Sequence, residues 1–101
     1  MEMALTAAEN TLFNVAELGS DPNFIQNNPT RLQALVGAAK YLATNNAIEA
    51  IDQAMRICGG AGLSMALPLQ RHYRDARAGL NNPPMDDISV TTLGKMALGL
   101  I

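Results

Sequence analysis

The sequence is poor in several residue types on which whole classes of protein depend. Its 101 residues include one cysteine, one histidine and no tryptophan, and charged side chains make up only 16%. A single cysteine, Cys58, excludes a disulfide within the chain, and without clustered carboxylates it leaves no set of metal ligands. We therefore expect a protein without a metal site, and the cysteine content favours a cytoplasmic location.

Positive charge and long apolar runs are also scarce. Seven basic against nine acidic side chains give a formal net charge of -2, so the positive surplus that binding to nucleic-acid phosphates requires is missing. Polar residues interrupt every apolar stretch before the roughly 20 residues needed to span a bilayer, and the N-terminus does not resemble a signal peptide. We expect neither nucleic acid nor a membrane among the partners.

Apolar residues, by contrast, are abundant. They make up 49% of the chain, which lies at the top of the globular range and excludes a disordered chain. A chain this short has too few polar side chains to cover its surface, and exposed apolar patches usually mark an interface. We therefore expect one domain over residues 1–101 that associates with a partner surface.

The first half of the chain has the apolar spacing of two helices. Apolar residues recur three and four positions apart over residues 1–18, and residues 19–22 end this helix. Residues 23–28 are rich in turn-forming side chains, which predicts a connection. Asn28 can cap a second, long helix with its side chain and Pro29 suits the first helical position, so this helix is expected to reach residue 58.

The second half predicts two shorter helices. Residues 59–62 contain the glycines that end the long helix, and a helix is expected from Pro68 to Arg77. Residues 81–84 cannot continue it, and Asp86 or Asp87 can cap a last helix over residues 88–100. No stretch alternates in the manner of a strand, so we expect an all-α antiparallel bundle of about four helices.

Two linked motifs give the chain a family resemblance. Gly-Gly-Ala-Gly at the end of the long helix is followed by Arg-His-Tyr-Arg-Asp-Ala-Arg, which runs from Arg71 to Arg77. In spacing and order this resembles the C-terminal helical domain of the acyl-CoA dehydrogenase family. The resemblance covers essentially the whole chain but only the later part of that bundle. It implies that the chain is a fragment of an acyl-CoA dehydrogenase-like protein.

The resemblance also implies a cofactor site. In the family, the glycine loop approaches the FAD of a neighbouring subunit, which would make Gly59, Gly60 and Gly62 cofactor-binding residues. A family glutamine that contacts the dinucleotide is replaced here by Arg56, whose guanidinium can donate to phosphate or adenine acceptors. The residues alone also allow a simpler interpretation, in which Gly59 caps the helix and the other two serve the turn.

The resemblance to the family also implies that this chain has no catalytic residue. Many family members carry, nine residues after the position of Arg74, a glutamate that removes the α-proton of the acyl thioester; Pro83 stands there instead. Proline offers no proton acceptor. Asp86 and Asp87 follow closely, and we interpret them as helix caps, with a displaced base as the alternative.

Three further features have structural interpretations. His72 is expected to be a partly exposed helical side chain, and Cys58 a small buried apolar residue. Arg71 and Asp75 are four residues apart, so they and the neighbouring arginines of the motif are expected to form a surface ion-pair network.

Two kinds of function remain open at this stage. One is the C-terminal helical domain of an acyl-CoA dehydrogenase-like flavoprotein, a homo-oligomer (dimer or tetramer) in which this domain contributes the subunit interface and part of the FAD site for acyl-CoA oxidation. The other is a non-catalytic helical oligomerisation module. A related flavin monooxygenase or oxidase is a variant of the first, because such enzymes need no base at Pro83.

Overall fold

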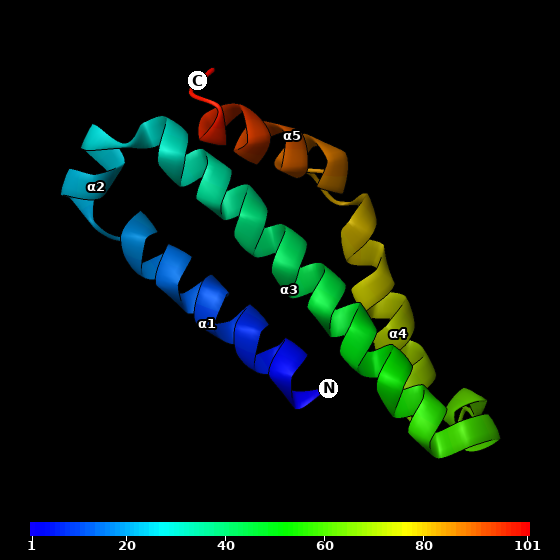
Figure 1. Ribbon diagram of the computed structural model, residues 1–101. Helices are drawn as coiled ribbons and strands as arrows, with labels where there is room; N and C mark the ends of the chain where they lie inside the picture. The colour runs from blue at the N-terminus through cyan, green and yellow to red at the C-terminus, as the bar shows by residue number, and fades with distance from the viewer.

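The computed structural model describes residues 1–101, and all its regular elements are helices (Figure 1). The α-helices are α1 (Glu2–Gly19), α2 (Pro22–Asn27), α3 (Pro29–Cys58), α4 (Leu69–Ala78) and α5 (Asp86–Ala97), and the two short 3-10 helices are η1 (Gly59–Leu63) and η2 (Gly79–Asn81). The predicted all-α class is confirmed. None of the helices combines the length and apolar character that a membrane-spanning segment requires.

The long helix α3 organises the molecule. It forms the middle of three antiparallel runs, with α1 along one side and α4 followed by α5 along the other (Figure 1). The molecule is accordingly elongated, with extents of 50 × 24 × 20 Å. The end of α3 that leads into η1 extends past the start of α1, so that η1 lies at one extreme of the molecule (Figure 1).

The interior consists of small side chains. Only 8 of the 101 residues are buried, and no large side chain is fully buried. On α3 the buried positions are Ala34, Gly37, Ala39 and Ala50, which allow the neighbouring helices to approach closely. Large apolar residues on several elements, including Phe13 with 67% of its surface exposed, remain open to solvent.

The connection between α1 and α3 differs from its prediction. Residues 22–27 form the short helix α2 instead of a turn, because an Asp21 side-chain oxygen accepts a hydrogen bond from the Asn23 amide at 3.0 Å. The predicted side-chain cap by Asn28 is wrong. Asn28 lies between two helices: its amide donates to Phe24 at 2.8 Å and its carbonyl accepts from Leu32 at 2.9 Å. Its backbone therefore serves both helices without the side chain.

The predicted caps of the last helix are also wrong. α5 begins at Asp86 and ends at Ala97, with Met85 at the capping position. Asp87 accepts a hydrogen bond only from the amide of the next residue, at 2.9 Å. The Asp86 carboxylate instead accepts from Asn45 Nδ2 of α3 at 3.0 Å. The Asp86 side chain therefore binds Asn45 of α3 instead of the backbone amides at the start of α5.

Candidate functional site

The glycine turn, residues 59–62, begins where α3 ends. Gly59 has a φ of 62° and a ψ of -144°, a backbone conformation that side-chain-bearing residues rarely adopt. Its amide donates a hydrogen bond to the Arg56 carbonyl. Gly59 therefore closes the helix, as one of the two sequence interpretations predicts.

Gly62 is needed for a different reason, which is close packing. It is buried, and a Cβ atom added there would lie 3.2 Å from the carbonyl oxygen and 3.3 Å from the Cα atom of Met55. Both atoms belong to the backbone of α3, which cannot move aside as a flexible side chain can. A side chain at residue 62 would therefore require the turn or α3 to shift by a few tenths of an ångström.

Gly60 has neither requirement. Its φ is not positive, and a Cβ atom added at this position would meet nothing within 4 Å. It is exposed at the end of the molecule. Nothing within this chain requires a glycine at residue 60, and Gly19 and Gly94 have the same open space around them.

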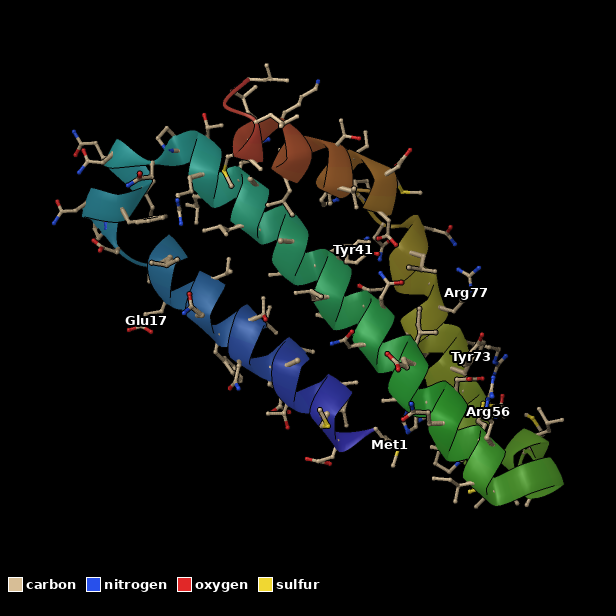
Figure 2. The ribbon with its side chains drawn as sticks, in the orientation of Figure 1. Met1, Glu17, Tyr41, Arg56, Tyr73 and Arg77 are labelled. Atoms are coloured by element: carbon tan, nitrogen blue, oxygen red, sulfur yellow. The ribbon has the colours of Figure 1, made fainter.

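Arg56 lies in the last turn of α3. Its side chain is 80% exposed, and its Nε atom donates to Asp52 Oδ2 at 3.0 Å, in the only salt bridge of the structure. The terminal guanidinium nitrogens make no hydrogen bond within the chain. Arg56 is labelled in Figure 2, on the part of α3 that leads into the glycine turn. Its free donors can therefore contact an anionic group that reaches the turn.

The predicted ion-pair network on α4 is wrong. No carboxylate lies within 4.0 Å of Arg71, Arg74 or Arg77, and Asp75 pairs with none of them. All four side chains are exposed, and exposed pairs gain little over full solvation of each charge. Figure 2 shows Arg77 on α4, together with the neighbouring Tyr73. A spacing of four residues on a helix permits an ion pair but does not ensure that it forms.

The loop that contains Pro83 is held against α3 by polar contacts. Lys40 Nζ donates to the Pro84 carbonyl at 3.0 Å, and Asn45 binds Asp86 as described above. The second carboxylate oxygen of Asp86, Oδ1, is buried and has no hydrogen-bond partner. Sequence analysis missed these contacts because Lys40 and Asn45 have the spacing of ordinary polar residues on a helix. Pro83 itself is exposed and supplies no proton acceptor.

The two remaining candidates have opposite outcomes. His72 is exposed on α4, which confirms its prediction as a helical surface residue. Cys58 is also exposed, so its prediction as a buried residue is wrong. It ends α3 beyond the part that α1 covers, next to Ile57, which is itself 77% exposed. No group of three side chains in the structure could hold a metal ion.

Comparisons with known proteins agree with the fold. The family model described as acyl-CoA dehydrogenase, C-terminal domain, matches residues 1–80. The Bacillus subtilis (strain 168) protein named "Putative acyl-CoA dehydrogenase YdbM" is 46% identical over 97 residues, which cover 96% of this chain and 24% of that relative. The chain thus spans about a quarter of the relative's length. It belongs to the acyl-CoA dehydrogenase family.

Proposed function

We propose that this chain is the C-terminal helical part of an acyl-CoA dehydrogenase-like flavoprotein, and that it contributes a subunit interface and part of an FAD site. Two findings support the assignment to the C-terminal part of such a protein. The chain belongs to the family, and it covers only 24% of the length of the similar Bacillus subtilis protein. The glycine turn supports the contribution to an FAD site. In this proposal residues 1–101 form one helical domain of a larger oligomeric protein that oxidises acyl-CoA.

The observation that carries the proposal is Gly60. Gly59 is explained by its φ and Gly62 by its contact with Met55, but Gly60 has open space around it. An exposed glycine without a role in its own fold is what a backbone needs if a ligand is to approach it closely. The dinucleotide part of FAD, bound across a subunit interface, is such a ligand.

The residues present fit this cofactor. Gly60 leaves room beside the backbone, and the free guanidinium nitrogens of Arg56 can donate to a phosphate or to adenine acceptors. FAD supplies hydride acceptance from the β-carbon of an acyl thioester. Pro83 has no proton acceptor, so abstraction of the α-proton has to use a base outside this loop.

A pair of substitutions in the complete protein tests the role of Arg56. Arg56→Ala removes the proposed contact with the dinucleotide, whereas Asp52→Ala breaks the same salt bridge and keeps the guanidinium. We expect the FAD content, measured as visible absorbance per subunit after gel filtration, to fall in Arg56→Ala and to be retained in Asp52→Ala. Equal FAD content in both variants and the wild type would remove Arg56 from the site.

A non-catalytic oligomerisation module is the second candidate. The exposed large apolar side chains favour it, because they account for association without any flavin. It predicts that the complete protein associates but contains no FAD. A stoichiometric flavin band in the purified protein would eliminate this candidate.

A further inference from the structure

Helix α5 has one face packed on α3 and the opposite face uncovered. It lies on the side of α3 away from α1 (Figure 1), and Ser89 on its inner face is only 4% exposed. Asp87, Thr91 and Lys95 are spaced four residues apart, so they share one side of the helix, and all three are exposed. We call this side the outer face of α5.

The outer face contains a hollow with the spacing of a helix contact. Its volume is about 270 Å³, and its lining consists of Asp87, Ile88, Thr91, Thr92 and Lys95. Residues 88, 91, 92 and 95 have the spacing i, i+3, i+4 and i+7. In paired helices, four residues of one helix form the hole that receives a side chain of the facing helix. The hollow therefore fits a side chain of a helix that lies alongside α5.

Apolar side chains border this hollow. Ile88 is 57% exposed, and Leu98, seven residues beyond Thr91 on the same side, is 76% exposed. Both would lose contact with water if a second helix lay along the outer face, and such burial favours association. The face thus has apolar side chains to bury as well as room for a partner's side chain.

The charges of the outer face lie at its two ends and are not paired within the chain. Asp87 is in the first turn of α5 and Lys95 in the last. Eight residues span about 12 Å along a helix, which is too far for these two side chains to meet. The only salt bridge of the structure joins Arg56 and Asp52, and Asp87 bonds only to the next amide. Each charge is therefore available to a partner.

This charge pattern is complementary to itself in one orientation. An antiparallel copy of α5 brings its basic end to the acidic end of the first helix, and the reverse at the other end. A parallel copy would place Asp87 beside a second Asp87 and Lys95 beside a second Lys95. Charge complementarity therefore selects the antiparallel arrangement, in which a two-fold axis produces each contact twice.

We propose that the outer face of α5 binds a second copy of this chain, with the two α5 helices antiparallel about a two-fold axis near Thr91. Asp87 pairs with Lys95 of the partner subunit at each end, and Ile88 packs into the hollow of the partner's helix. The inference rests on the subunit interface of the proposed function and specifies which face and which residues form it.

Charge reversal in the full 101-residue chain tests the pairing. Asp87→Lys and Lys95→Asp each turn two attractions across the axis into two repulsions. We expect each to raise the dimer Kd about tenfold in sedimentation equilibrium at low ionic strength, where exposed charges are least screened. The double variant Asp87→Lys/Lys95→Asp restores both pairs, so its Kd should return to within about twofold of the wild type.

The double variant also separates association from folding. The natural charges favour the helix dipole at both ends of α5, and each reversal opposes it, so the double variant should have the lowest thermal stability in circular dichroism. A restored Kd in the least stable variant can come only from the pairing of charges. Glu9→Lys is the control, because it changes the net charge equally at an exposed residue of α1, and it should leave the Kd unchanged.

A cross-link tests the orientation. With Cys58→Ser as the background, Thr91→Cys places a thiol near the two-fold axis in each copy, and oxidised glutathione should convert the two thiols into an intermolecular disulfide. Thr6→Cys in the same background, at an exposed residue of α1, is the control. We expect a covalent dimer on a non-reducing gel for Thr91→Cys and much less for Thr6→Cys.

Three results would overturn the proposal: single reversals that leave the dimer Kd unchanged, a double variant that associates no better than the single ones, and a chain that is monomeric at every concentration. A dimer with an unchanged Kd would assign the contact to another face, such as the apolar hollow between α1 and α3. None of these results bears on the FAD content of the Arg56 and Asp52 variants, so the two proposals fail separately.

Discussion

At the residue scale, the glycine turn contains three glycines in three different environments. Gly59 needs a positive φ, Gly62 lies against the backbone of Met55, and Gly60 has no constraint within the chain. The sequence shows the same residue three times. The distinction is physical and testable, because a methyl group added at each position meets a different environment.

Gly62→Ala is expected to destabilise the protein, whereas Gly60→Ala is not. The new Cβ at residue 62 would lie 3.2 Å from a backbone oxygen, and overpacking of this kind costs about 1–3 kcal/mol in free energy of unfolding. At residue 60 the methyl group meets nothing within 4 Å. Urea unfolding followed by circular dichroism measures both. Equal stability of the two variants would contradict the packing of the turn against α3.

At the scale of helices, the contact between α3 and α5 depends on polar groups that the sequence does not single out. Asn45 binds both the Tyr41 carbonyl at 2.9 Å and Asp86 Oδ2 at 3.0 Å, and Lys40 binds the Pro84 carbonyl at 3.0 Å. The bonds to Asp86 and to the Pro84 carbonyl join positions more than 40 residues apart in sequence. They fix where α5 begins and how its first turn lies on α3.

Two neighbouring aspartates give a matched test of this contact. Asp86→Ala removes the bond to Asn45 and should lower the free energy of unfolding by about 1–2 kcal/mol. Asp87→Ala removes a carboxylate from the same first turn of α5, but one that bonds only to the next amide in the chain. We expect a smaller loss for Asp87→Ala in thermal unfolding. A larger loss for Asp87→Ala than for Asp86→Ala would contradict the importance of the bond between Asp86 and Asn45.

The sequence predicted most of the fold for a simple reason. Apolar spacing and the positions of Pro29 and Gly59 depend only on neighbouring residues, so the bounds of α1, α3 and α4 agree closely with the predictions. The predictions that failed depended on competition between partners. Asn28 is shared by two helices, and Asp86 binds a residue of α3. Neither the hydrogen bonds of Asn28 nor the partner of Asp86 can be predicted from the spacing of neighbouring residues.

The candidate site was predictable in position but not in detail. Glycine spacing located the turn, yet the difference between Gly60 and Gly62 required the position of Met55. The arginines of α4 were recognised as a cluster and given the wrong role, because a spacing of four residues shows that an ion pair is possible and not that it forms. Cys58 was placed inside because its sequence neighbours are apolar, whereas the end of α3 is uncovered.

At the scale of the whole molecule, the apolar faces are only partly covered. The hollow between α1 and α3 has a volume of about 490 Å³ and a mostly apolar lining that includes Leu12, Val15 and Val36. Only 8 residues are buried, and 18 large apolar side chains are exposed; extensive exposed apolar surface usually marks an interface. We therefore expect other chains or further segments of a larger protein to cover these faces.

The chain on its own is accordingly expected to associate. Sedimentation equilibrium over a range of concentrations should show a dimer or higher oligomer, and unfolding midpoints should rise with protein concentration because association stabilises the folded form. A well-folded species at 10.7 kDa at every concentration would contradict this view of the exposed faces.

The flavin content of a Gly60→Leu variant of the complete protein tests the central claim most directly. The leucine side chain has open space within the chain, so helix content and stability should equal those of the wild type. Gly94→Leu, at another glycine with nothing within 4 Å, is the control for the substitution itself. If the turn forms part of an FAD site, Gly60→Leu loses FAD and Gly94→Leu retains it. Full FAD content in a folded Gly60→Leu protein would show that no cofactor approaches the turn.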